Sequence, residues 1–456
     1  MDLSREQQIA FDKYAEGANV FVTGPGGTGK SVLIREIFKD ALSKKKKIAV
    51  CAMTGCAAVL LKCNARTIHS WGGLGRCVGE PSDIIQRIYD NKYKRRNWEC
   101  VHILVIDEVS MMSKKLFGIL NDLGKKIRKS NQPFGGIQLI FSGDFFQLPP
   151  VGEKNEVETS QFCFENDQWS DVFPRNTHIL LHKIFRQEDE TYAKVLNQLR
   201  EGRLKRSSYD ILVKQVGKPP LDETDVTPTK LFPRRSSVDK VNNEEMSKIP
   251  GDARSYIIQR VSDLCPVGKG KKYSTQELDY EYDYLQGSIP GENEIMLKVG
   301  AQVMCVVNIE DAGMGHSLCN GSQGKVVGFS EKNMPIVKFR GIAFPITMAY
   351  HTWASESIPH IGLRHIPLAL AWAMTIHKSQ GTTLDLAEID VGDGVFECGQ
   401  TYVALSRVKS LEGLYLTKFN YQRVFTNKKV KEFYKSLDTE DDAVKVSATE
   451  EECSDG

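Results

Sequence analysis

The segment from Gly24 to Ser31 reads Gly-Pro-Gly-Gly-Thr-Gly-Lys-Ser, which is the spacing of a phosphate-binding loop. Glycines at these positions let backbone N–H groups wrap around phosphate oxygens, and the start of the following helix adds partial positive charge. Lys30 would bridge the β- and γ-phosphates of a nucleoside triphosphate, and the Ser31 hydroxyl would bind Mg²⁺. The segment therefore predicts a triphosphate site.

The same segment also contains Gly24, Gly26 and Gly29 at the spacing of a dinucleotide-binding fingerprint. That fingerprint requires an acidic residue near the end of the second strand, where it holds a ribose. Here the second strand region, 48–53, reads Ile-Ala-Val-Cys-Ala-Met and contains no acid. A dinucleotide would also leave the adjacent Lys-Ser pair unexplained. The pattern thus favours a triphosphate over a nicotinamide or flavin cofactor.

Asp107 and Glu108 directly follow an apolar run, 103–106, that reads as a buried strand. Ligands of parallel sheets gather at the carboxyl ends of the strands, so this pair is well placed to meet the phosphate loop. Asp107 can help to hold the metal ion, and Glu108 can orient and deprotonate an attacking water. Together with the loop, the pair predicts nucleoside triphosphate hydrolysis.

An α/β sheet must position these residues, because short β-branched runs alternate with amphipathic stretches in the first half of the chain. We expect strands at 20–23, 48–51, 103–106 and 139–142, and helices at 31–42 and 114–129. The last of these strands leads to Gln147, whose amide could reach a γ-phosphate. Gln7, ahead of the first strand, could pair with both a donor and an acceptor on the edge of adenine.

A second α/β set begins near residue 179 and is expected to contain helices at 188–201 and 236–248. Short alternating segments rich in Gly, Pro and Tyr from about 250 to 359 indicate a small inserted β domain, after which the α/β pattern resumes at 366–370. Arg186 and Arg407 follow apolar stretches of the second set. An arginine delivered across a cleft can stabilise the charge of a phosphoryl-transfer transition state.

The chain of 456 residues, with 41% apolar and 26% charged residues, has the balance of a soluble globular protein of about three structural units. Its best candidate for a membrane span, 366–376, is too short, and residues 1–8 lack the layout of a signal peptide. Eleven scattered cysteines without a Cys-x-x-Cys pair indicate reduced thiols rather than a disulfide framework or a zinc site. These features exclude membrane and secreted classes and predict an intracellular protein, with nucleus and cytoplasm both left open.

The net charge of +2 hides an uneven distribution. Residues 438–456 contain eight acids and one lysine, a formal charge of −7, so residues 1–437 carry about +9. A basic body with an acidic tail, which we expect to be disordered, fits a polyanionic partner. Ordinary surface charge with a solubilising tail explains the same numbers equally well.

Four further segments are similar to motifs of a known helicase family: Ala52-Met-Thr-Gly-Cys-Ala-Ala58, Thr67-Ile-His-Ser-Trp71, Gly143-Asp-Phe-Phe-Gln-Leu-Pro-Pro150 and Met374-Thr-Ile-His-Lys-Ser-Gln-Gly-Thr-Thr-Leu-Asp385. With them, the chain resembles superfamily-one helicases of the 5′-to-3′ branch, and within that branch the petite-integration-frequency (Pif) family, from Leu3 to about Leu416. The sequence departs from the family pattern at Trp71-Gly72-Gly73 and at His365, which leaves the segment after Trp71 least defined.

The resemblance implies ATP and Mg²⁺ as cofactors and assigns roles to matching residues. The catalytic set would be Lys30, Asp107, Glu108, Gln147, Arg186 and Arg407. The nucleotide would be held by Gln7, Gly24, Gly26, Gly27, Thr28, Gly29, Lys30, Ser31, Gln380 and Gly381, and the metal by Ser31 and Asp107. DNA would contact Thr54, His69, Ser70, Thr375, His377 and Lys378.

The implied activity is ATP-dependent 5′-to-3′ unwinding in replication, repair or recombination, with single-stranded, 5′-tailed or forked DNA as partner and RNA–DNA hybrids or G-quadruplexes as further substrates. We expect a monomer in solution, with a dimer on DNA as an alternative. Trp71 or Phe145 could stack on bases. A RecD-like recombination translocase and an ATPase-dead single-stranded-DNA-binding module are the competing interpretations.

The implied fold class is α/β, with two RecA-like parallel-sheet domains, an inserted SH3-like β-barrel and a short accessory insertion in the first domain. The expected boundaries are 1–180 for the first domain with its insertion, which would hold the wedge, at about 72–97, 181–249 with 360–437 for the second, 250–359 for the barrel and 438–456 for the acidic tail.

Overall fold

The computed structural model describes residues 3–437 except 62, 76, 78, 188, 220–226, 265–272, 290–291, 308, 310–317, 319–320, 356–357 and 359. The predicted acidic tail, 438–456, therefore lies outside the described residues. Within the described part, no helix is both long enough and apolar enough to cross a membrane.

The first sheet has six parallel strands in the order β3 (Arg66–Thr67), β2 (Ile48–Ala52), β4 (Ile103–Asp107), β5 (Gln138–Gly143), β1 (Val20–Thr23) and β6 (His178–Leu180). β1 and β4 are buried along their whole length because helices cover the sheet. The long helices of this unit are α1 (Arg5–Ala15), α2 (Lys30–Ser43) and α7 (Lys114–Arg128). The strands and helices predicted for this half are confirmed within one or two residues.

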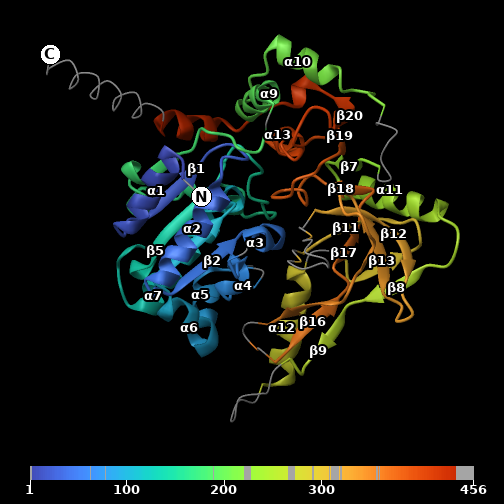
Figure 1. Ribbon diagram of the computed structural model, residues 1–456. Helices are drawn as coiled ribbons and strands as arrows, with labels where there is room; N and C mark the ends of the chain where they lie inside the picture. The colour runs from blue at the N-terminus through green and yellow to red at the C-terminus, as the bar shows by residue number, and fades with distance from the viewer. Residues whose placement is uncertain are drawn as a thin grey trace.

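The second sheet has four parallel strands in the order β18 (Ala373–Thr375), β7 (Thr229–Phe232), β19 (Ala387–Val391) and β20 (Leu414–Phe419). The helices of this unit are α9 (Glu190–Glu201), α10 (Arg206–Val213), α11 (Arg235–Lys248) and α13 (Gln400–Leu405). Figure 1 shows the first unit in blue and cyan beside the second in green, orange and red. The predicted α/β class with two parallel sheets is confirmed.

Antiparallel strands lie between α11 and β18 along the chain. They are β8 (Arg254–Ile257), β9 (Gln259–Val261), β10 (Glu294–Leu297), β11 (Gln302–Cys305), β12 (Gln323–Phe329), β13 (Pro335–Phe339), β14 (Ile346–Thr347), β15 (His351–Ala354), β16 (Gly362–His365) and β17 (Leu368–Leu370). Helix α12 (Thr275–Ser288) accompanies them. The SH3-like form of this part stays a prediction.

The predicted start of the returning α/β segment at residue 360 is wrong. β16 pairs antiparallel with β15 and β9, and β17 pairs antiparallel with β11. Ile366 and Leu368 are buried in the core of the antiparallel part. A short apolar run reads as a buried strand of either kind of sheet, so its pattern could not identify its partner.

The insertion after β3 is helical and packs against the first unit. It contains α4 (Ile68–Trp71), α5 (Pro81–Asp90) and α6 (Lys92–Cys100), of which the last two pack on α7, while α3 (Gly55–Leu61) precedes β3. The rings of Trp71 and Trp98 lie 4.8 Å apart, and only 4% of Trp71 is exposed. Phe145 is 1% exposed within the same core. The prediction that Trp71 or Phe145 stacks on bases is therefore wrong, because both rings are enclosed.

A last helix, 428–437, returns to the first unit although the sequence placed it with the second. Its Val430 and Tyr434 are buried in the first unit's core. Phe433 stacks on Phe164 at 4.5 Å between ring centroids, and Tyr434 stacks on Phe146 at 4.6 Å. In Figure 1 this red helix lies at the upper end of the first unit. The assignment of residues up to 437 to the second domain is thus wrong at its end.

Candidate nucleotide-binding active site

The phosphate loop joins β1 to α2, and its glycines are required by its backbone. Gly24 has φ +145°, and a Cβ there would lie 2.4 Å from the Leu181 carbonyl oxygen. Gly29 has φ +80°, which L side chains rarely adopt. The Lys30 Nζ donates to the carbonyl oxygens of Gly24 at 2.6 Å and Pro25 at 3.0 Å. Burial lowers the pKa of Lys30, partly offset by Asp144 and Glu108, so a bound polyphosphate would favour its charged form.

Two carboxylates stand at the carboxyl end of β4, beside the phosphate loop. Burial, together with the smaller effect of the neighbouring Glu108 charge, raises the pKa of Asp107 to about 6. Glu108 itself has φ +57° and ψ +39°, a left-handed conformation that is uncommon for a non-glycine residue. The Ser31 hydroxyl and the Asp107 carboxylate are hard oxygen donors lining one cavity, and this donor set fits Mg²⁺.

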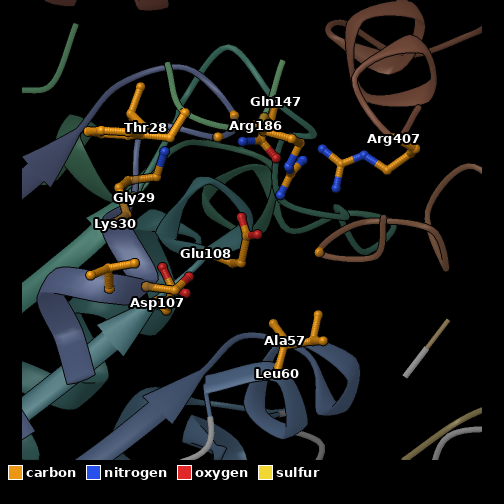
Figure 2. A pocket seen from close by; sticks show the side chains of 16 residues that line it. Thr28, Gly29, Lys30, Ala57, Leu60, Asp107, Glu108, Gln147, Arg186 and Arg407 are labelled. Carbon is orange, nitrogen blue, oxygen red and sulfur yellow. The ribbon is translucent and has the colours of Figure 1, made fainter. Parts of the chain in front are cut away.

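A cavity of about 310 Å³ brings most of the predicted catalytic and nucleotide-binding residues together (Figure 2). The predicted residues that line it are Gly26, Gly27, Thr28, Gly29, Lys30, Ser31, Asp107, Glu108, Gln147, Arg186, Gly381 and Arg407. The cavity thus lies between the first sheet's loops and loops of the second unit. This is the cleft for which the sequence predicted triphosphate chemistry.

Arg407 approaches the cavity from the end of α13, and Arg186 approaches from the segment after β6 (Figure 2). The Arg407 Nε donates to the Val403 carbonyl oxygen at 2.9 Å, and an Arg186 terminal nitrogen donates to the Ser406 carbonyl oxygen at 3.3 Å. Burial, together with the smaller effect of the nearby Arg186 charge, lowers the pKa of Arg407 to about 10. The guanidinium groups of Arg186 and Arg407 line one cavity and repel each other, so an anion between them would relieve the repulsion.

Three predicted nucleotide-binding residues do not line the cavity. Gly24 is buried beneath the loop. The Gln7 Nε2 donates to the carbonyl oxygens of Thr28 at 3.1 Å and Gly29 at 3.3 Å, while its Oε1 caps α1 by accepting from Ser4 N at 2.9 Å. In this arrangement Gln7 supports the loop from behind. Its adenine role stays a prediction.

Gln380 lies beside the cavity and contacts the candidate base. Its Nε2 donates to a Glu108 carboxylate oxygen at 3.2 Å, and only 2% of the residue is exposed. The bond crosses from the loop after β18 to the end of β4. Gln380 of the second unit therefore contacts the candidate base Glu108 directly, and Arg407 of the same unit also lines the cavity.

Sequence reasoning missed several lining residues, of which Phe185 is the most informative. Phe185 is 51% exposed and lines the cavity next to Arg186, and its backbone N–H donates to the Gly27 carbonyl oxygen at 2.8 Å. Its aromatic face could cover a planar base. An aromatic residue directly before a candidate arginine finger was the available signal. Val32, Ala57 and Leu60 complete the lining.

A buried ion pair joins the two units next to the phosphate loop. The Arg200 guanidinium donates to both oxygens of Asp144, at 2.9–3.1 Å. Its Cζ also lies 4.5 Å from the Phe146 ring centroid and 5.0 Å from that of Tyr434. The Tyr402 hydroxyl accepts from Gly26 N at 2.9 Å and reaches Asp144 at 3.4 Å. We call Asp144, Arg200, Tyr402 and Tyr434 the interdomain latch.

Replacing Arg200 with alanine is expected to destabilise the protein by about 3–5 kcal/mol, because Asp144 would stay buried without its partner. Urea unfolding measures the loss. A double variant, Asp144→Leu with Arg200→Met, removes both charges and is expected to recover most of the stability. An Arg200→Ala protein as stable as the parent would show that the latch contributes nothing.

The predicted DNA-binding residues fall into two groups along the chain. Thr54, His69 and Ser70 lie at the starts of α3 and α4, while Thr375, His377 and Lys378 lie at the end of β18. The loop after β18 approaches α3 so closely that a Cβ on Gly381 would lie 3.4 Å from Leu60 Cδ1. Lys378 is exposed, and the other five are half-buried. Contact of these residues with DNA stays a prediction.

Two family descriptions match the chain. The description "PIF1-like helicase" matches residues 2–210, and "DNA helicase Pif1, 2B domain" matches residues 284–329. The second match falls within the antiparallel part, from the end of α12 to β12. The two matches therefore cover the phosphate loop, the carboxylate pair, Arg186 and part of the inserted strands.

A crystal structure of Pif1 helicase from Candida albicans is 35% identical, covers 96% of this chain and 100% of that chain, and has a TM-score of 0.77. A crystal structure of Bacteroides sp Pif1 in complex with ADP-AlF4 is 28% identical, with 96% and 98% covered and a TM-score of 0.76. Among curated proteins, ATP-dependent DNA helicase PIF1 of Emericella nidulans is 34% identical over 94% of this chain. The chain spans 62% of that protein's length. The chain belongs to the Pif1-like helicase family.

Proposed function

We propose that the protein is an ATP-dependent DNA helicase that moves 5′ to 3′ along single-stranded DNA and separates duplex. One observation carries this proposal. Arg186 and Arg407 of the second unit line the same cavity as Lys30 and Glu108 of the first. Cations supplied to the triphosphate from two sides are what a motor whose two domains close on a nucleotide requires. The names of the relatives support the same activity.

The chain's own residues can perform the hydrolysis. Lys30 would bind the transferred phosphoryl group, and Glu108 would accept a proton from the attacking water, with Gln380 fixing its carboxylate. Gln147 presents a buried amide to the cavity, and its Oε1 has no partner among the described residues. Mg²⁺ held by Ser31 and Asp107 would neutralise phosphate charge. Arg186 and Arg407 would stabilise the transition state from the other side.

Movement follows from the charge that hydrolysis removes. While a triphosphate is bound, attraction to Arg186 and Arg407 keeps the cleft closed. After cleavage and departure of the γ-phosphate as inorganic phosphate, that attraction weakens and the cleft opens. If Thr54, His69 and Ser70 grip the strand alternately with Thr375, His377 and Lys378, each cycle advances the protein. Phosphate contacts of this kind bind without sequence preference and weaken with salt.

Single-stranded and forked DNA are the proposed partners. Solved relatives include Bacteroides Pif1 bound to single-stranded DNA and two coordinating Pif1 helicases at forked duplex DNA. We propose a monomer in solution that can act as two copies at a fork. The helical insertion α5–α6 is the proposed wedge.

A tailed-duplex assay tests the proposed function. The protein should separate a duplex with a 5′ single-stranded tail and leave a 3′-tailed or blunt duplex intact, and single-stranded DNA should stimulate its ATPase. A translocase subunit would hydrolyse ATP on the strand without separating duplex, and an ATPase-dead binding module would not hydrolyse it. Unwinding of the 3′-tailed duplex instead would overturn the proposed direction.

A further inference from the structure

Helix α13 of the second unit fixes the position of Arg407. Its first turn carries Tyr402, and Arg407 lies just beyond its last residue, Leu405. The Arg407 Nε donates to the Val403 carbonyl oxygen at 2.9 Å, and one of its terminal nitrogens donates to the Ser406 hydroxyl at 2.8 Å. The guanidinium group is therefore held by α13 and the residue that follows it, so a contact that places α13 also places Arg407.

The Tyr402 hydroxyl joins α13 to the phosphate loop of the first unit. It accepts a hydrogen bond from the Gly26 backbone N–H at 2.9 Å and donates one to an Asp144 carboxylate oxygen at 3.4 Å. Only 2% of Tyr402 is exposed. Gly26 lines the cavity, whereas Tyr402 reaches the loop from outside it. Tyr402 therefore contacts the nucleotide site through the loop.

The start of α13 also packs tightly against the first unit. A Cβ on Gly399, the residue before the helix, would lie 2.3 Å from the Phe146 carbonyl oxygen and 2.7 Å from that of Gln147. These backbone atoms belong to the segment that presents the buried Gln147 amide to the cavity. A side-chain hydrogen bond and close backbone packing thus hold the same end of α13 against the first unit.

A buried tyrosine often contributes packing alone, and the second unit provides an example. Tyr415 in β20 is also 2% exposed, and its hydroxyl has no hydrogen-bond partner among the described residues. Tyr402 differs in two respects. Its hydroxyl contacts a loop that would bind phosphate, and its helix holds the arginine that lines the same cavity.

We propose that Tyr402 is a positioning residue for ATP hydrolysis: its hydroxyl holds α13 against the phosphate loop and thereby sets the distance of Arg407 from the triphosphate. The inference rests on the proposed function and deepens it. Because catalysis depends steeply on geometry, a shift of about 1 Å in a transition-state group slows a reaction strongly. Loss of the hydroxyl therefore acts on the transition state through Arg407.

Removal of this one hydroxyl tests the proposal. With saturating single-stranded DNA, Tyr402→Phe is expected to lower kcat for ATP about tenfold, while the KM for ATP changes less than about twofold. Tyr415→Phe is the matched control and should leave both constants unchanged. In an Arg407→Ala background, Tyr402→Phe should lower kcat no further, because the hydroxyl acts through the group already removed.

The outcomes are separable. If the parent hydrolyses ATP and Tyr402→Phe matches it, or changes only KM, the positioning role is refuted while the helicase proposal stands. The role is also refuted if Tyr402→Phe and Arg407→Ala lower kcat by independent factors that multiply. If the parent hydrolyses no ATP, the proposed function and the positioning role fail together.

Amide exchange in the parent protein gives a second test that needs no variant. Without nucleotide, the Gly26 N–H should exchange slowly with solvent deuterium, as a hydrogen-bonded amide does. A Gly26 amide that exchanges as fast as an unprotected loop would overturn the contact on which the proposal depends. Tyr402→Phe keeps the buried ring, so it should fold, and its thermal unfolding midpoint verifies this.

Discussion

Replacing Lys30 with alanine is expected to abolish ATP hydrolysis and DNA unwinding, with a fall in turnover of at least about 10³-fold. The reason is its position, because Lys30 Nζ lies in the cavity where it now donates to two loop carbonyls that a phosphate would replace. Steady-state ATPase with saturating single-stranded DNA and the 5′-tailed duplex assay measure the effect.

The variant should nevertheless fold. Burial lowers the pKa of Lys30, so its charge is unfavourable in the free protein, and a neutral replacement relieves that cost. Lys39→Ala is the matched control in the same helix, because its side chain is 69% exposed in an i,i+3 pair with Glu36. Unwinding that survives Lys30→Ala in a folded protein would refute the assignment of this site.

Replacing Arg407 with alanine is expected to reduce turnover about 10³-fold or more, because an arginine finger acts mainly in the transition state. For the same reason the KM for ATP should change much less than kcat. Arg407→Lys keeps a charge but loses the planar fork, and should recover little of the loss. Rapid-mix measurements of ATP turnover with single-stranded DNA separate these effects.

Arg206→Ala provides the control for Arg407, because Arg206 is 83% exposed in a helical i,i+4 pair of the same unit and should change neither constant. An Arg407→Ala enzyme with normal kcat and raised KM would show that Arg407 only binds the nucleotide. In that case closure of the second unit would not contribute to the chemical step.

The sequence predicted those features of the fold and the site that depend on local residue patterns. The strand 20–23, the phosphate loop and the carboxylate pair each combine a distinct apolar run with reactive residues at its end, so both position and chemistry are readable. The placement of Arg407 in the cavity followed from motif resemblance, since a lone arginine after an apolar stretch carries no partner information. In the structure, Arg407 and Lys30 line the same cavity.

The errors share one physical cause, which is that a local pattern does not specify its packing partner. The apolar run 366–370 indicates a buried strand, and in the structure its β17 pairs with β11. Trp71 is enclosed by Trp98, which lies far along the chain. The rings of Phe433 and Tyr434 favour burial in an aromatic core, but the sequence does not indicate which unit provides that core.

The return of helix 428–437 to the first unit gives the chain two crossings between the units, one near residue 181 and one near residue 427. Two separate chain connections limit how far the second unit can move away from the first. If the cleft opens and closes as proposed, both connections restrict the relative motion of the two units.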